Sequence, residues 1–211
     1  EINGCNVTVP FKKTVIPFLD KLSLEAEQAQ SVNTICFNNG DLVGHNTDIS
    51  GFQKAINSLN YKIKDKKILI LGAGGVVPSL IIALHKMEAS EITISNRTSK
   101  KAEDLKIQFN KINTVRWGEV PDFDMIINAT SLGLNNETID LNTSNIGQDK
   151  FFYDVIYNPN ETNFLKLGKK LGNQIENGKL MFIYQAFEAF RLWHGVEPDV
   201  SEKILKLLDH D

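Results

Sequence analysis

Two short stretches near the start of the chain have the residue types that proton-transfer chemistry needs. In Asn6-Val-Thr8-Val-Pro10-Phe-Lys12, Thr8 and Lys12 follow a strand-like run, and Asp48 ends the stretch Asn46-Thr-Asp48. Open α/β sheets present ligand groups at the ends of their strands, and a lysine there can act as a general acid or base. Asp48 is suited to pair with Lys12, orient it and bind a substrate hydroxyl. The alternative is a surface lysine and a helix-capping aspartate.

A glycine-rich turn is the next stretch suited to binding a ligand. The apolar run 68–71 leads into Gly72-Ala-Gly74-Gly75, and a helix-like segment follows. Gly72 permits a tight turn, Gly74 lets the backbone approach a pyrophosphate, and the free N–H groups at the helix start attract that anion. This order of strand, turn, helix and second strand predicts a dinucleotide-binding unit. The third glycine position holds Val77, which we expect to loosen the helix–strand contact; a glycine turn without a ligand is the alternative.

The end of the second strand indicates which dinucleotide binds. An NAD-binding fold usually has Asp or Glu here to accept the ribose hydroxyls, but this chain has Asn96 and Arg97. A carboxylate would repel a 2′-phosphate, whereas a guanidinium binds it bidentately. Lys101, one helical turn further on, adds positive charge. The residues favour NADP over NAD, with an ordinary surface arginine as the alternative for Arg97.

The elements that would position these groups alternate between strand-like and helix-like. Between residues 65 and 180 this alternation predicts a parallel sheet with right-handed crossovers. The predicted fold class is α/β: a Rossmann-like, doubly wound parallel sheet that binds NADP, plus a partial N-terminal α/β substrate domain completed by C-terminal helices. The expected domains are residues 1–48, 49–184 and 185–211. Strands are expected over 5–9, 32–37, 42–44, 67–71, 91–95, 124–128 and 151–155, and helices over 15–29, 52–59, 78–87, 99–110, 162–171, 180–193 and 200–208.

Composition excludes several other classes of protein. The chain has 211 residues, a formal net charge of -3 and no basic tail, so nothing in it attracts nucleic acid or an anionic membrane in general. The longest apolar run, 76–84, is too short to span a bilayer. Two cysteines outside any Cys/His cluster predict neither a disulfide framework nor a metal site. No basic-then-apolar leader is visible, so we expect a cytoplasmic protein. We also expect it to bind small molecules and to be a monomer or a homodimer.

Along essentially its whole length the chain resembles the shikimate dehydrogenases. Eight stretches match in the family's order: Asn6-Val-Thr-Val-Pro-Phe-Lys12, Ser31-Val-Asn-Thr34, Asn46-Thr-Asp48, Gly72-Ala-Gly-Gly75, Asn96-Arg-Thr98, Asn128-Ala-Thr-Ser131, Asp154-Val-Ile-Tyr157-Asn-Pro159 and Tyr184-Gln185-Ala186. The ordered set is far more specific than any one stretch. The resemblance implies reversible, NADPH-dependent reduction of 3-dehydroshikimate to shikimate, a step of chorismate and aromatic amino-acid biosynthesis.

The resemblance also implies a role for individual residues. Lys12 and Asp48 match the family's catalytic pair, and a positioned ammonium suits this chemistry, because hydride transfer to a ketone develops negative charge on its oxygen. The residues that match shikimate contacts are Thr8, Asn33, Tyr157 and Gln185. The expected NADP-binding residues are Gly72, Gly74, Gly75, Asn96, Arg97, Thr98, Lys101, Thr130 and Gly178.

The start of the chain departs from the family's pattern. Members carry about fifty residues before the Asn-Val-Thr stretch, with a Ser-x-Ser pattern that binds the substrate carboxylate. The present sequence has five residues there and no such pattern. We therefore expect an exposed sheet edge, exposed apolar surface and weakened shikimate binding. A truncated chain, a gap filled by a neighbouring copy, and a segment removed from the protein stay open as explanations. Two other functions also stay open: an NADP-binding module or remnant without turnover, and a quinate/shikimate dehydrogenase that prefers NAD, against which Arg97 argues.

Overall fold

The computed structural model describes residues 2–144, 146–200 and 206. The contacts divide the chain into two compact units. Unit 1 comprises the described residues of Glu1–Tyr61, Pro78–Ala83 and Leu180–His210, and unit 2 those of Lys62–Val77 and Leu84–Lys179. Helix α2 (Asp48–Ser58) thus belongs to unit 1, beyond the boundary expected at residue 48, and α3 (Val77–Lys86) is divided between the units.

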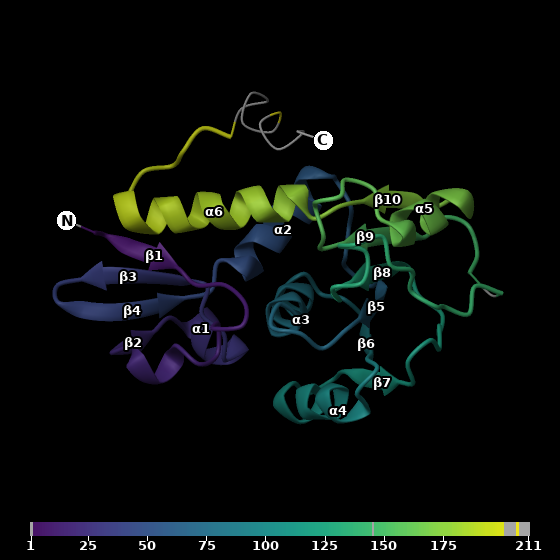
Figure 1. Ribbon diagram of the computed structural model, residues 1–211, viewed down its shortest axis with the longest axis horizontal. Helices are drawn as coiled ribbons and strands as arrows, with labels where there is room; N and C mark the ends of the chain where they lie inside the picture. The colour runs from purple at the N-terminus through teal and green to yellow at the C-terminus, as the bar shows by residue number, and fades with distance from the viewer. Residues whose placement is uncertain (1, 145, 201–205, 207–211) are drawn as a thin grey trace. The chain divides into compact units, whose positions relative to one another are not determined.

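Unit 2 is built on a six-stranded parallel sheet with the order β10-β9-β8-β5-β6-β7. Its strands are β5 (Lys67–Leu71), β6 (Glu91–Ser95), β7 (Asn113–Val115), β8 (Met125–Asn128), β9 (Phe151–Asp154) and β10 (Gln174–Glu176). The four central strands are almost wholly buried, as a parallel sheet covered on both faces requires. Helix α4 (Ser99–Gln108) lies on one side of the sheet and α5 (Asn163–Lys170) on the other (Figure 1). The predicted Rossmann-like, doubly wound fold is confirmed.

The core under α5 shows how tightly this sheet is held. The ring of Phe152 in β9 lies 5.2 Å from that of Phe164 in α5 and 6.1 Å from that of Phe123, centroid to centroid. Gly168 of α5 packs against the same ring, because a Cβ added there would lie 2.6 Å from Phe152 Cγ. This close packing fixes β9, whose last residue is the buried Asp154.

Unit 1 contains a smaller mixed sheet with the order β1-β3-β4-β2. Strand β1 (Gly4–Asn6) pairs antiparallel with β3 (Thr34–Asn38), β3 pairs antiparallel with β4 (Asp41–His45), and β2 (Lys21–Leu22) pairs parallel with β4. The β3–β4 hairpin turns through Asn39 and Gly40, both with positive φ, as expected for these residue types. The long helix α6 (Lys179–His194) is fastened to this sheet by Trp193, whose Nε1 donates to the carbonyl of Ile35 at 3.0 Å.

The prediction of one helix over residues 15–29 was wrong. The structure has a short 3₁₀ helix, η1 (Ile16–Phe18), then β2, then α1 (Leu24–Ala29). Pro17 has no amide hydrogen to continue a helical ladder, and the Ser23 hydroxyl starts a new helix by accepting from the amide of Ala26 at 3.2 Å. The helical spacing arose because these separate elements bury their apolar residues in one cluster.

Two short strands also differ from the prediction, and one predicted helix is not tested. Strands β7 and β10 were not predicted, since each is three residues long and lies at a sheet edge, where the pattern is weak. The helix expected over 200–208 falls almost wholly outside the described residues.

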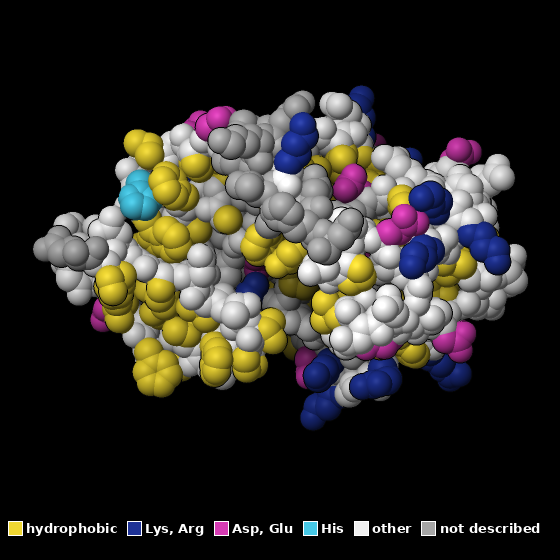
Figure 2. All heavy atoms as spheres, turned by 45° about the horizontal axis from the view of Figure 1, so that its top comes forward, with side chains coloured by type: hydrophobic (Ala, Val, Ile, Leu, Met, Phe, Trp, Pro, Cys, Tyr) yellow, Lys and Arg dark blue, Asp and Glu magenta, His cyan; other side chains and the backbone are white. Residues whose placement is uncertain are grey.

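Unit 1 exposes several large apolar side chains. Its exposed apolar side chains include Ile2, Val9, Phe11, Phe18 and Phe37, and Figure 2 shows hydrophobic side chains gathered over this part of the chain. Strand β1 forms one edge of the sheet. The exposed edge and apolar surface expected from the sequence are therefore present. Among the described helices, none is long and apolar enough to cross a membrane.

Candidate active site

A nearly buried ion pair lies at the centre of the polar residues of unit 1. Lys12 Nζ donates to Asp48 Oδ2 at 2.6 Å, with side chains only 14% and 7% exposed. Lys12 lies in the turns that follow β1, and its carbonyl accepts from the amide of Val32 at 2.8 Å. Asp48 is in the first turn of α2, where the unpaired N–H groups of the helix favour a negative charge. The pairing considered from the sequence is thus present in the structure.

Asn33 connects this pair to the rest of the site. Its Nδ2 lies 2.9 Å from Asp48 Oδ1, 2.9 Å from Thr47 Oγ1 and 3.3 Å from Gln185 Oε1. Its Oδ1 accepts from the amide of Thr47 at 2.8 Å. Asn33 is itself buried, directly before β3. Both oxygens of Asp48 are therefore engaged, one by a cation and one by an amide, which fixes the orientation of the carboxylate.

The arrangement is suited to moving a proton. An ammonium has three donors, and Asp48 orients Lys12 through one of them, so the others can face a ligand oxygen. In a largely dry site, such a positioned cation stabilises negative charge on that oxygen far better than it would in water. The carboxamide of Gln185 extends the polar surface; its Nε2 donates to the carbonyl of Phe182 at 3.0 Å.

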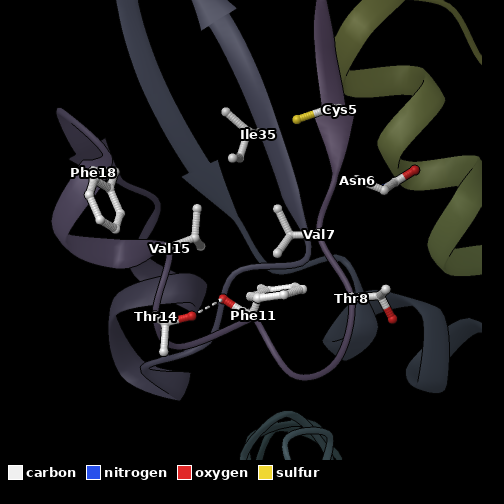
Figure 3. Close-up of a pocket in the computed structure, with 9 residues that line it drawn as sticks. All are labelled: Cys5, Asn6, Val7, Thr8, Phe11, Thr14, Val15, Phe18 and Ile35. Carbon is white, nitrogen blue, oxygen red and sulfur yellow. Dashed lines mark hydrogen bonds between the residues drawn. The ribbon is translucent and has the colours of Figure 1, made fainter.

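Thr8 is exposed on the turn before Lys12, and the structure does not place its hydroxyl in this hydrogen-bonded group. It lines an open, mostly apolar depression of about 490 Å³. In Figure 3, Asn6 and Thr8 lie on one side of this depression and Val15 and Phe18 on the other. Its walls offer little to a polar substrate, so we place the candidate chemistry at Lys12.

Unit 2 gathers the predicted cofactor residues at the carboxyl ends of its strands. Leu71 is in register with Ser95 on one side and with Asn128 on the other, and Asn128 is in register with Asp154. The four strands therefore end level. The strand order reverses at β5, with β6 on one side and β8 on the other. Ligands of open α/β sheets bind at such a switch point.

The glycine turn after β5 has the geometry of a phosphate cradle. Gly72 has φ +110°, and a Cβ there would lie 2.8 Å from the carbonyl oxygen of Ala129. Among the described residues, a Cβ at Gly74 would lie 3.8 Å from that same oxygen and near no other atom, and a Cβ at Gly75 would meet nothing within 4 Å. Gly72 is thus needed by the turn itself, whereas Gly74 and Gly75 leave room beside the start of α3. Open backbone space beside a helix start is the kind of site at which anions such as a pyrophosphate bind.

The loop after β6 carries the expected cations. Asn96 Nδ2 donates to the carbonyl of Thr98 at 2.8 Å, and the amide of Lys101 donates to the same carbonyl at 3.0 Å. Arg97, Thr98 and Lys101 are exposed at the start of α4. Two exposed cations beside a fixed loop suit a phosphate group at the end of β6.

A buried carboxylate holds the loop after β8. The amide and hydroxyl of Thr130 both donate to Asn128 Oδ1, at 3.0 and 2.7 Å. Asn128 Nδ2 in turn donates to Asp154, which also accepts from the Thr162 hydroxyl at 2.6 Å and the Ile156 amide at 2.9 Å. Burial raises the pKa of Asp154, and these hydrogen bonds offset part of the rise. Thr130 is therefore fixed by a chain of bonds that ends in the core.

Two more predicted residues lie in unit 2. Tyr157 is half-buried in the loop after β9. Gly178 is buried, its amide donates to the carbonyl of Ile156 at 3.1 Å, and a Cβ there would overlap the carbonyl of Val155 at 2.1 Å. Unit 2 thus holds Tyr157, while the other expected substrate residues, Thr8, Asn33 and Gln185, belong to unit 1.

Some residues of these networks had no role in the sequence-based prediction. Thr47, Asn128, Asp154 and Thr162 were not assigned roles from the sequence. Two of them could have been recognised, because Asn128 and Asp154 are each a polar residue at the last position of a buried strand. Within the described ranges, no group of three or more His, Cys, Asp or Glu side chains could hold a metal ion.

Three family models match the chain. They describe the shikimate dehydrogenase substrate binding domain over residues 1–35, shikimate / quinate 5-dehydrogenase over 53–176, and the shikimate 5'-dehydrogenase C-terminal domain over 180–202. A shikimate dehydrogenase (NADP(+)) of Pelagibacter ubique is 56% identical over 99% of this chain and 79% of its own length.

Solved structures are similar over nearly the whole chain. Shikimate 5-dehydrogenase from Thermus thermophilus, in complex with NADP(H) and shikimate, has a TM-score of 0.89 and 31% identity, covering 98% of this chain and 79% of its own. Quinate dehydrogenase from Corynebacterium glutamicum, in complex with NAD, has a TM-score of 0.88 and 31% identity, covering 98% and 77%.

Proposed function

Because the chain belongs to the shikimate dehydrogenase family, we propose that it catalyses the reversible, NADP-dependent interconversion of shikimate and 3-dehydroshikimate. The observation that carries this proposal is the Lys12–Asp48 pair, held at 2.6 Å and braced by Asn33. We further propose that it does so in the cytoplasm, acting on small molecules alone.

Lys12 is the proposed proton donor in the reducing direction. When bound, NADPH supplies the hydride that reduces the ketone carbon. As charge develops on the ketone oxygen, Lys12 Nζ stabilises it and transfers a proton to it. Asp48 keeps the ammonium aimed and stabilises its positive charge. In the oxidising direction, Lys12 takes the hydroxyl proton back.

Asn33 and Gln185 are proposed to bind substrate hydroxyls beside Lys12. Asn33 is braced by Thr47 and Asp48, so its amide is fixed before a ligand arrives. A preorganised amide loses little entropy on binding. We propose that Thr8 and Tyr157 add further substrate contacts.

Arg97 and Lys101 are proposed to bind the 2′-phosphate of NADP, and Gly74 and Gly75 to admit its pyrophosphate. The support is the open space above both glycines and the exposed cations at the start of α4. Asn96, Thr98, Thr130 and Gly178 are proposed to complete the cofactor site. A carboxylate that would favour NAD is absent from the end of β6, since Asn96 and Arg97 follow Ser95.

The test is the appearance of NADPH absorbance when purified chain is mixed with shikimate and NADP. We expect turnover with NADP and much less with NAD. Micromolar NADP binding without turnover would instead support the binding module, and equal or better turnover with NAD would overturn the assignment of Arg97.

A further inference from the structure

Helices α2 and α6 of unit 1 approach each other at one point beside the candidate site. A Cβ added to Gly51 of α2 would lie 2.9 Å from both the amide nitrogen and the Cβ of Gln185 in α6. Real side chains essentially never come so close, so Gly51 sets how near α6 can lie to α2. The residue at the contact is Gln185, whose carboxamide meets Asn33.

An ion pair between a partly exposed lysine and a buried carboxylate lies one helical turn further along both helices. Glu188, three residues after Gln185, is 6% exposed. Lys54, three residues after Gly51, places its Nζ 2.6 Å from Glu188 Oε1. The other oxygen, Oε2, accepts from Arg191 Nε at 3.0 Å and Nη2 at 2.9 Å.

The two cations on this carboxylate differ in what they connect. Arg191 is on α6 itself, one turn from Glu188, so its bond stays within one helix. Lys54 comes from α2 and joins the two helices. Its Nζ also lies 4.4 Å from the centroid of the Phe187 ring, a second contact with α6. Burial raises the pKa of Glu188, but Lys54 and Arg191 lower it more, so the carboxylate stays charged at neutral pH.

We propose that Lys54 and Glu188 are positioning residues for substrate binding: their ion pair fixes the register of α6 on α2 and so holds Gln185 against Asn33. This inference rests on the proposed function, because Gln185 is there a substrate contact. The contact from Asn33 Nδ2 to Gln185 Oε1 is already 3.3 Å long. A donor–acceptor distance of about 3.6 Å no longer makes a hydrogen bond, so a small slide of α6 breaks this one and leaves the shorter bonds from Asn33 to Thr47 and Asp48 in place.

The experiment compares Lys54→Met with Arg191→Met in the full chain. Both variants remove one cation from Glu188, but only Lys54→Met removes an ion pair between α2 and α6. We expect Lys54→Met to raise KM for shikimate about 3- to 10-fold, the loss of roughly one hydrogen bond, with kcat and the KM for NADP unchanged. Arg191→Met should change KM far less, and Lys54→Arg should restore the wild-type value.

A double variant separates positioning from general stability. In a Gln185→Ala background, Lys54→Met should have no further effect on KM, because the group that it positions is gone. An equal further rise in KM, or the same rise in Arg191→Met, would overturn the inference. Inactive wild-type protein would instead count against the proposed function.

A second readout needs no turnover. The side-chain amide resonances of Asn33 and Gln185 should shift in Lys54→Met and stay in place in Arg191→Met. Unmoved resonances in Lys54→Met would overturn the inference whatever the activity.

Discussion

The glycine turn of unit 2 offers the sharpest separation between a residue needed by the fold and one needed by the ligand. We predict that Gly72→Ala destabilises the protein and that Gly74→Ala does not. At Gly72 the backbone has φ +110°, and the new Cβ would lie 2.8 Å from the Ala129 oxygen. The strained conformation and the overlap together cost about 2 to 5 kcal/mol.

The same methyl group at Gly74 should act on the ligand alone. Its contact in the protein is the Ala129 oxygen at 3.8 Å, an ordinary van der Waals distance. The methyl would, however, fill the space that the pyrophosphate needs. We therefore expect the unfolding free energy to change by less than about 1 kcal/mol while NADP affinity falls at least about tenfold, or ~1.4 kcal/mol.

Two measurements check this pair of variants. Urea unfolding followed by circular dichroism gives the stability, and titration with NADP gives the affinity. Gly75→Ala serves as a control, because its Cβ would meet nothing within 4 Å of the protein and stability should stay near that of wild type. The reasoning is refuted if Gly72→Ala is as stable as wild type, or if Gly74→Ala binds NADP normally.

Two further predictions concern charged groups. Arg97→Asp should weaken NADP binding by about tenfold or more, the loss of a charge-assisted contact, while NAD binding changes little. Lys100→Asp makes the same change in net charge and should lose much less NADP affinity. Equal losses of NADP affinity in a titration would count against a specific role for Arg97. Hydrogen bonds from the backbone of Asn135 and Gly133 lower the pKa of Glu137 to about 2. These bonds therefore stabilise the loop fully at pH values above the ordinary carboxyl pKa, and the stabilisation is lost as the pH falls toward 2. The amide resonances of both residues should titrate with a midpoint near 2 and stop doing so in Glu137→Gln, whereas a midpoint at the ordinary value of 4.5 would contradict the structure.

The sequence predicted the central sheet well because its signals are local. Each of the strands β5, β6, β8 and β9 is a short apolar run, and the glycine turn follows β5 directly. Burial on both faces makes such runs continuous. The rule for right-handed crossovers supports a parallel sheet, whereas the strand order and the level strand ends come from the structure.

Local signals failed where distant residues decide the structure. The spacing of Val15, Leu19 and Leu22 is helical, yet Val15 and Leu19 flank the short 3₁₀ helix, Leu22 lies in β2, and all three pack in one cluster. The pairing of Lys12 with Asp48 was a possibility in the sequence, but its bracing by Asn33 depends on residues that the fold alone brings together. The same holds for Gly51 and Lys54, whose partners on α6 lie more than a hundred positions away in the sequence.

The measurement that tests the central claim most directly is the single-turnover rate of NADPH oxidation with 3-dehydroshikimate, in wild type and in Lys12→Met. Its matched control is Lys13→Met, which alters the exposed neighbouring lysine. The account predicts a loss of about 10² to 10⁴-fold in Lys12→Met, with unchanged NADP affinity and a near wild-type rate in Lys13→Met. Equal rates in wild type and Lys12→Met would contradict the role of Lys12 as the proton donor.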